Sequence, residues 1–286
     1  TPPATMSAIR LHRPGDPAAL AYEQIQTPRP GQGEVLVRVH AAAITRDELD
    51  WPADRLPATP SYEFSGIVAE VGQGVDDVTA GQEVFALSGF DRDGAAADYI
   101  LVPLDVLAPK PVSLGHVESA SLPLAGLSAW QGLFDHGRLR QGERVLIHGA
   151  AGGVGGLAVQ LAHERGASVV GTCSPNNVQT ARELGADEVI DHTTTRFEDV
   201  VGHVDLVFDT VGGDRLERSL AVLGKGGRLV SVASGPPQEE AAKQGVEAVY
   251  FVVEPNRSEL IEIARLADGG ELRPSIDAVF PLWEAR

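Results

Sequence analysis

Cysteine and positive charge are scarce in this chain of 286 residues. Cys173 is the only cysteine, so neither an intrachain disulfide nor a cysteine-built zinc site can form. Lysine and arginine number 23 against 40 acidic residues, and the net charge of -17 argues against nucleic acid and anionic membrane surfaces as partners. No apolar run is long enough to span a bilayer, and no charged-then-apolar signal segment opens the chain. We therefore expect a soluble, cytoplasmic protein.

The length and the local patterns predict two domains. A chain of 286 residues exceeds the size at which one hydrophobic core usually stops growing. From Met6 to about Pro109, short β-branched runs such as 34–39 and 66–71 alternate with glycine, proline and aspartate clusters. This pattern is typical of a barrel-like all-β module. From Ser113 the pattern becomes helical and leads into a second domain.

The stretch 145–156, which reads VLIHGAAGGVGG, indicates a dinucleotide site. Its Ala150-x-Gly152-x-x-Gly155 spacing is the glycine fingerprint with alanine in the first place. Small residues allow the sharp turn, the close approach of a pyrophosphate and tight helix packing, while the helix N-terminus attracts the phosphates. A glycine-rich turn without a ligand is the alternative. A strand before the loop, a helix to Gly166 and a second strand at 167–172 complete a βαβ unit and favour the dinucleotide.

The residues after that second strand favour NADP over NAD. An NAD site usually places a carboxylate there, whereas this chain has Cys173, Ser174, Pro175, Asn176 and Asn177. Hydroxyl and amide groups can bind a 2′-phosphate. No lysine or arginine stands between Arg165 and Arg182, so a cation would come from Arg182 or from a distant side chain. Ordinary helix capping by Ser174 and the asparagines is the alternative interpretation.

The α/β alternation continues to residue 268. Apolar strands are expected at 188–190, 204–208, 228–232 and 246–253, with helices between them and a last helix over 256–268. This order predicts a doubly wound parallel sheet.

Motifs along the whole chain resemble the zinc-free quinone oxidoreductase and enone reductase branch of the medium-chain dehydrogenase/reductase superfamily. The motifs that carry the resemblance are Ala8 to Gly15, Pro60 to Val68, Leu122 to Trp130, His148 to Gly155, Leu184 to Asp191 and Asp209 to Gly213. The resemblance implies an α/β fold: a Rossmann-type doubly wound sheet at 126–270 and a partly open β-barrel domain at 1–125. Residues 271–286 would complete the barrel, together with a further helix and strand with which the family usually continues. The family's active site lies in the cleft between the domains.

The resemblance also implies a homodimer, because the family's edge corresponding to Val246–Val253 commonly pairs across a two-fold axis. This run is too apolar for an exposed sheet edge.

The zinc ligands of related alcohol dehydrogenases are replaced in this chain. Thr45 stands at the approximate place of a cysteine and Tyr62 at that of a histidine, and Glu63 alone cannot hold zinc. We therefore expect no catalytic metal and a hydride transfer from NADPH to an acceptor activated by conjugation, a small-molecule quinone or enone. Tyr62 is the candidate hydrogen-bond or proton donor, and plain packing of Tyr62 is an equal alternative.

The remaining site residues follow from the resemblance. Thr45, Trp51, Phe90 and Asp91 are expected at the substrate end, and Ser128 beside the nicotinamide. The full set expected to bind the cofactor is Ser128, Ala150, Gly152, Gly153, Val154, Gly155, Cys173, Ser174, Asn176, Thr210, Val211, Ala233, Phe251 and Val253.

Two other functions stay open at this point. One is an enoyl-thioester reductase of polyketide type, which shares the fold and the glycine loop. The other is a non-catalytic NADPH-binding protein with a structural or sensing role, although the chain offers no regulatory domain or basic surface to support it.

Overall fold

The computed structural model describes residues 1–45, 47–51 and 54–286. The chain forms two compact units: unit 1 comprises residues 1–124, 254–270 and 274–286, and unit 2 comprises residues 125–253 and 271–273. None of the helices formed by the described residues is both long enough and apolar enough to cross a membrane.

Unit 1 is built on an antiparallel five-stranded sheet with the strand order β6-β3-β4-β5-β7. Valine, phenylalanine and isoleucine side chains from these strands form its core, for example Val37, Phe64 and Ile100. The strands are β3 (Glu34–Ala43), β4 (Glu63–Val71), β5 (Glu83–Leu87), β6 (Tyr99–Pro103) and β7 (Ala108–Pro109). Together with the hairpin below, they form the antiparallel domain that was predicted as a partly open barrel.

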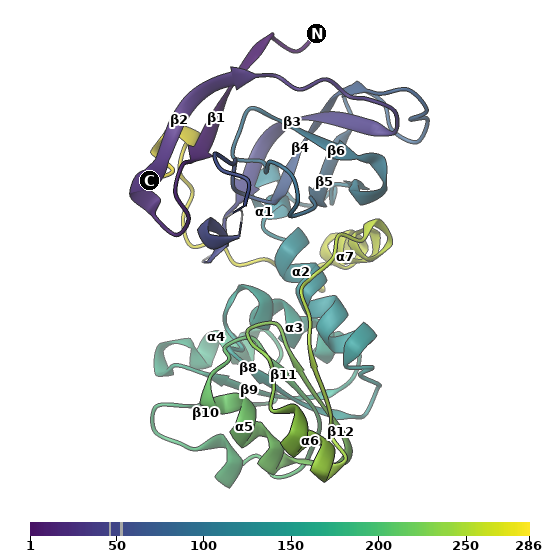
Figure 1. Ribbon diagram of the computed structural model, residues 1–286. Coiled ribbons are helices and arrows are strands. Elements are labelled where there is room, and N and C mark those ends of the chain that lie inside the picture. The colour runs from purple at the N-terminus through teal and green to yellow at the C-terminus, as the bar shows by residue number, and fades with distance from the viewer. Residues whose placement is uncertain (46, 52–53) are drawn as a thin grey trace. The chain divides into compact units, whose positions relative to one another are not determined.

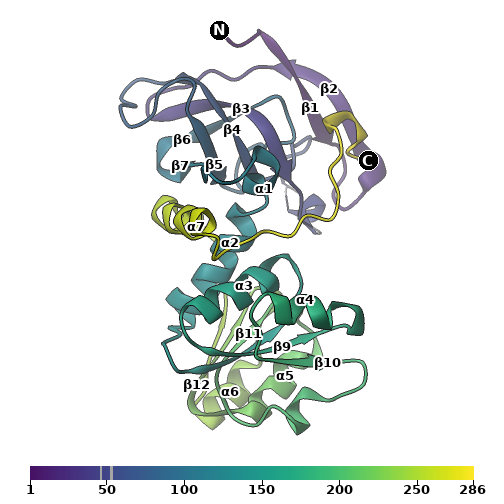
Figure 2. The same ribbon diagram turned by 180° about the vertical axis from the view of Figure 1, so that it is seen from behind.

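A hairpin of β1 (Thr5–Leu11) and β2 (Leu20–Gln26) adds to unit 1. Isolated bridges join Ala8 to Ala97 and Leu11 to Ala58. The last residues of the chain lie beside this hairpin, and the Arg286 Nε–H donates to the Leu20 carbonyl at 2.7 Å (Figure 2).

The helix α7 (Arg257–Gly269) belongs to unit 1. The domain boundaries expected from the sequence place residues 254–270 in the dinucleotide-binding domain instead. Hydrogen bonds explain the difference. The Ser113 N–H donates to Asp268 Oδ1 at 2.8 Å, and the Arg257 guanidinium lies 3.3 Å from Asp77 Oδ2. Unit 1 also contains α1 (His116–Ala120), and α2 (Pro123–Trp130) begins there.

Unit 2 is a parallel six-stranded sheet with the order β10-β9-β8-β11-β12-β13, which is the doubly wound order predicted from the sequence. Its strands are short, apolar and mostly buried on both faces, as parallel strands covered by helices must be. The strands are β8 (Arg144–His148), β9 (Ser168–Cys173), β10 (Glu188–Asp191), β11 (Val204–Asp209), β12 (Leu223–Ser231) and β13 (Glu247–Tyr250).

Helices cover both faces of this sheet. Helices α3 (Gly153–Glu164) and α4 (Val178–Glu183) lie on one face, and α5 (Asp214–Ser219) and α6 (Gln238–Gln244) lie on the other (Figure 1). Because all strands run in one direction, their carboxyl ends meet at one edge, where ligands of such sheets bind.

Candidate functional site

The turn between β8 and α3 is built almost entirely from backbone. Gly149 has a positive φ of 76°, and a Cβ there would lie 2.5 Å from Thr210 Oγ1. At Gly155 a Cβ would overlap the carbonyl oxygen of Gly149. The turn therefore requires the absence of side chains at these two positions.

The first turn of α3 is open to a ligand. Gly152 is the N-cap of α3, and no side chain caps it. The first backbone N–H groups of a helix have no partner within the helix and carry a partial positive charge. A Cβ added at Gly153 would meet no atom within 4 Å, so space remains in front of this turn. These features fit a pyrophosphate, and Ala150, Gly152, Gly153, Val154 and Gly155 would surround it.

The loop after β11 lies against the glycine loop. Thr210 Oγ1 donates to the His148 carbonyl at 2.8 Å. The Asp209 carboxylate accepts the N–H groups of Val211 and Gly212 and the hydroxyl of Ser231, at 3.3, 2.9 and 2.8 Å. Burial raises the pKa of Asp209, and these hydrogen bonds oppose that shift. Asp209 therefore fixes the backbone of the second loop at the point where the strand order reverses.

The same network extends to the next strands. Ser231 Oγ accepts the Ala233 N–H at 3.1 Å, and the Phe251 N–H donates to the Ser231 carbonyl at 3.2 Å. The Phe251 ring packs on the His136 ring with their centroids 4.4 Å apart. Val253, which follows Phe251 by two residues, is buried, and so is Ser128 on α2.

His148 under the glycine loop is neutral and structural. Its Nδ1 lies 2.9 Å from Thr172 Oγ1, and its Nε2 lies 3.0 Å from Ser219 Oγ. Burial lowers its pKa to about 3. A neutral imidazole that bridges two hydroxyls holds β8, β9 and α5 together.

Ser174 and Asn176 follow the end of β9, as expected, and a carboxylate that the sequence did not indicate lies beside that strand end. Ser174 Oγ accepts Asn177 Nδ2 at 3.1 Å, which is the turn chemistry considered as an alternative, and Asn176 is exposed. Cys173 pairs in register with Asp191 at the end of β10. Burial and the charge of Asp191 raise the pKa of the Cys173 thiol. A carboxylate therefore lies beside the strand end, although it is distant in the sequence.

The substrate-end residues expected in unit 1 form an aromatic cluster. The Trp51 ring stacks on Tyr62 at 5.9 Å between centroids, and the Phe90 ring meets each of them edge-on at 5.2 Å. Tyr62 is 0% exposed and Trp51 38% exposed. Asp91 lies outside the cluster and is exposed. Tyr62 is thus fully covered by its neighbours, and its assignment as a donor stays a prediction.

Two buried carboxyl groups lie under this cluster. Glu48 accepts the backbone N–H groups of Thr45, at 2.9 Å, and of Ser61. Glu63 Oε2 accepts the Leu124 N–H at 2.8 Å. Burial raises the pKa of Glu48 to about 7 and that of Glu63 to about 8. Thr45 therefore contacts Glu48, a residue that no sequence motif indicated, through its backbone N–H.

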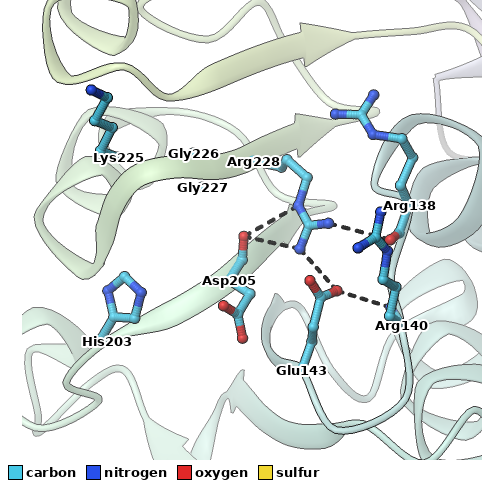
Figure 3. A pocket seen from close by; sticks show the side chains of 9 residues that line it. All are labelled: Arg138, Arg140, Glu143, His203, Asp205, Lys225, Gly226, Gly227 and Arg228. Atoms are coloured by element: carbon cyan, nitrogen blue, oxygen red, sulfur yellow. Dashed lines mark hydrogen bonds and ion pairs between the residues drawn. The ribbon is translucent and has the colours of Figure 1, made fainter.

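A polar pocket of about 320 Å³ lies at the opposite edge of the unit 2 sheet, at the amino ends of β8 and β11 (Figure 3). Its lining residues are Arg138, Arg140, Glu143, His203, Asp205, Lys225, Gly226, Gly227 and Arg228. The buried Arg228 pairs with Glu143 at 2.9 Å and donates to the carbonyls of Asp205 and Arg138. These internal pairs tie loops together, and the pocket lies at the sheet edge opposite to the one where ligands of such sheets bind.

The fold and the glycine loop define a nicotinamide-dependent dehydrogenase or reductase. Comparisons with known proteins agree. The family described as "Alcohol dehydrogenase GroES-like domain" matches residues 31–112, and "Zinc-binding dehydrogenase" matches residues 184–286. Within the described residues, no three histidine, cysteine, aspartate or glutamate side chains are placed to hold a metal ion.

Individual relatives span nearly the whole chain. A 2-methylene-furan-3-one reductase of Solanum lycopersicum is 32% identical over 98% of this chain and 73% of its own length. An "NADPH-dependent alkenal/one oxidoreductase, chloroplastic" of Arabidopsis thaliana is 32% identical over 90% of this chain and 68% of its own length. The quinone oxidoreductase structure from Coxiella burnetii is 33% identical, with a TM-score of 0.92 over 98% of this chain and 93% of that one. This chain belongs to the medium-chain dehydrogenase/reductase superfamily and is an oxidoreductase.

Proposed function

We propose that this oxidoreductase uses NADPH to reduce a quinone or an α,β-unsaturated carbonyl compound without a metal ion. The observation that carries the proposal is the open turn at Gly149–Gly155, where a Cβ at Gly155 would overlap backbone and the N-terminus of α3 has no side-chain cap. A bound dihydronicotinamide supplies a hydride, that is, two electrons and one hydrogen nucleus. The relatives described above, two reductases of unsaturated carbonyl compounds by name and a quinone oxidoreductase, support the two acceptor classes.

The residues of unit 2 would hold the cofactor mainly through backbone. The N–H groups of Gly153, Val154 and Gly155 would bind the pyrophosphate. The loop of Thr210 and Val211, fixed by Asp209, and the backbone near Ala233, Phe251 and Val253 would hold the ribose and the nicotinamide amide, with Ser128 beside the ring. At the end of β9, Cys173, Ser174 and Asn176 would face the adenosine ribose.

NADPH is preferred in this proposal because residues 173–177 carry no acid. The Asp191 carboxylate beside Cys173 opposes a 2′-phosphate in part, but its oxygens already accept Thr193 N–H at 2.9 Å, Thr193 Oγ1 at 2.7 Å and Thr194 Oγ1 at 3.3 Å. The preference therefore rests on the donors of Ser174 and Asn176.

We further propose a homodimer that forms through β13. This strand is at the edge of the six-stranded sheet, and Tyr250 and Val252 are 46% and 59% exposed. An exposed apolar edge strand readily pairs with another copy. Sedimentation equilibrium should give twice the mass of 30.1 kDa, and Val252→Glu should shift it to the monomer. A wild-type monomer at micromolar concentration would contradict this proposal.

The decisive experiment measures oxidation of NADPH at 340 nm with 1,4-benzoquinone and with cyclohex-2-enone, using NADH as the control donor. We expect turnover with at least one acceptor, and faster turnover with NADPH than with NADH. Cofactor binding is measured separately by fluorescence. NADPH binding without turnover of either acceptor would contradict the proposed reaction and favour a thioester substrate or a non-catalytic role.

A further inference from the structure

An arginine that the sequence motifs did not indicate lies in the aromatic cluster of unit 1. Arg55 is half-buried, and its Nη2 donates two hydrogen bonds, to the Phe90 carbonyl at 2.8 Å and to Tyr62 Oη at 3.3 Å. Phe90 and Tyr62 also pack edge to face. These two contacts fix the guanidinium at the partly exposed side of a cluster whose centre is fully buried.

The charge of Arg55 has no counter-ion among the residues described, 1–45, 47–51 and 54–286. No carboxylate of that set lies within 4 Å of the guanidinium, and Nε and Nη1 make no hydrogen bond within it. The other half-buried arginines of unit 1 are paired, Arg10 with Asp93 at 2.7 Å, Arg92 with Glu34 at 3.8 Å and Arg257 with Asp77 at 3.3 Å. A half-buried cation without a partner is costly, so a fold that keeps one indicates a negative charge supplied by a ligand.

The free donors of Arg55 suit a single oxygen. A guanidinium binds a carboxylate through two parallel N–H groups, and both such forks include Nη2. Both hydrogens of Nη2 are already used by Phe90 and Tyr62. Nε and Nη1 are left, and their N–H groups point away from each other, so neither fork is free for a carboxylate. Either group can still donate to one oxygen that gains charge during a reaction.

We propose that Arg55 is a catalytic residue that binds the carbonyl oxygen of the enone or quinone substrate and stabilises the negative charge that develops on it. The inference rests on the proposed function. When a hydride adds to the β-carbon of an enone, the C=C π pair moves and the carbonyl oxygen takes the charge of an enolate. A proton from water then adds to the α-carbon, and the saturated ketone forms. Charge-assisted hydrogen bonds to that oxygen lower the barrier.

Tyr62 becomes a positioning residue in this arrangement. An arginine can only donate, so the Tyr62 oxygen is the acceptor of their hydrogen bond. Tyr62 is fully buried and cannot itself reach a substrate in this structure. Tyr62 would hold the guanidinium through this hydrogen bond, while Arg55 itself is only half-buried. Removal of the Tyr62 hydroxyl should therefore affect turnover less than removal of the Arg55 charge.

The test compares Arg55→Gln, Arg55→Lys and Tyr62→Phe with the control Arg92→Gln. Arg92 is also half-buried in unit 1 and also donates to a carbonyl, that of Leu101 at 3.0 Å. With cyclohex-2-enone, we expect Arg55→Gln to lower kcat/KM by about 100-fold, as loss of one oxyanion donor does. Arg55→Lys should recover about 10-fold of this loss because it keeps the charge. Tyr62→Phe should cost less than about 10-fold, and Arg92→Gln should have no effect on kcat/KM.

A binding measurement that needs no turnover accompanies the kinetics. 4-Nitrophenolate carries one anionic oxygen, and benzoate carries a carboxylate on a ring of similar size. The wild-type protein should bind 4-nitrophenolate at least 10-fold more tightly than Arg55→Gln does, with no such difference for benzoate. The affinity for NADPH should be equal in all variants because unit 2 is unchanged.

The outcomes separate this inference from the proposed function. If the wild-type protein reduces an acceptor and Arg55→Gln retains its kcat/KM and its affinity for 4-nitrophenolate, the assignment of Arg55 is wrong and the proposed function stands. If the wild-type protein reduces neither acceptor, the proposed function fails and the inference fails with it. A loss in Arg55→Gln that Arg55→Lys does not relieve at all would indicate a structural role and would also overturn the assignment.

Discussion

The glycine loop of unit 2 and the aromatic cluster of unit 1 are built in opposite ways. The loop uses backbone N–H groups and the absence of side chains, with Gly149 and Gly155 in contact. The cluster consists of the large side chains of Trp51, Tyr62 and Phe90, which come from three separate segments. Unit 1 buries the carboxyl groups of Glu48 and Glu63, which neighbours Tyr62 in the chain, whereas residues 149–155 of the loop have no ionisable side chain.

This difference determines how each site responds to change. In a site made of backbone, a side chain added where two backbone segments touch destabilises the fold, because moving the main chain costs much free energy. A site made of side chains tolerates exchange of one member but responds to pH, since burial has shifted the pKa values of Glu48 and Glu63. Four substitutions test this comparison.

The largest effect is expected for Gly155→Ala. The added Cβ would overlap the Gly149 carbonyl, and backbone atoms are the nearest neighbours. We expect a loss of about 3 kcal/mol in the free energy of unfolding, and a loss of NADPH binding by at least about 100-fold. Urea denaturation and fluorescence titration measure both. Gly235→Ala is the control because its Cβ would meet nothing within 4 Å. Equal stability and equal NADPH affinity of the two variants would refute the claim that the backbone contact at Gly155 forms the site.

The second effect concerns the pH dependence of stability. The pKa of Glu63 is raised from 4.5 to about 8, so the folded state binds its proton more tightly than the unfolded state. The associated stability is fully present below pH 4.5 and is lost as pH rises through 8. Glu63→Gln stays neutral and can still accept the Leu124 N–H. We expect the fall in unfolding free energy between pH 6 and pH 9 to be smaller in this variant by about 2 kcal/mol.

Urea denaturation at the two pH values checks this expectation. Glu118→Gln, which removes an exposed carboxyl of the same unit, serves as the control. An unchanged slope in Glu63→Gln would show that Glu63 is ionised in the folded protein at pH 6.

A smaller effect is expected for Gly153→Ala. Its Cβ would meet no protein atom, and alanine favours a helix over glycine, so stability should be unchanged or rise by about 0.5 kcal/mol. The methyl group would point into the space assigned to the pyrophosphate. NADPH affinity should therefore fall by about 10-fold, or about 1.4 kcal/mol. Unchanged affinity in titrations monitored by nicotinamide fluorescence would argue that the pyrophosphate lies elsewhere.

The smallest effect is expected for Asp191→Asn. Its carboxylate lies beside Cys173, where the 2′-phosphate of NADPH is proposed to bind. Removal of the charge should strengthen NADPH binding by about 3-fold through reduced repulsion at a largely exposed site and leave NADH binding unchanged. Dissociation constants of both cofactors at low ionic strength provide the measurement. Equal changes for NADPH and NADH would place the 2′-phosphate away from β10.

The architecture and the glycine loop could be predicted from the order of residues alone. The parallel sheet followed from apolar strands alternating with helical periodicity, and the loop followed from Ala150, Gly152 and Gly155, because a close backbone approach admits few residue types at fixed spacing. Such constraints act between neighbours in the chain and are therefore visible there. The doubly wound order and the family membership were both confirmed.

The other features of the two sites depend on how distant segments pack, and the folded structure was needed to find them. It brought Asp191 beside Cys173, joined Glu48 to Thr45 and Ser61, and fixed Arg55 on Tyr62 and Phe90. It also assigned α7 to unit 1 and covered Tyr62 completely. These features depend on burial and on contacts between segments that are far apart in sequence. No local spacing encodes them, because the charge, the exposure and the partner of a side chain are set by what packs against it.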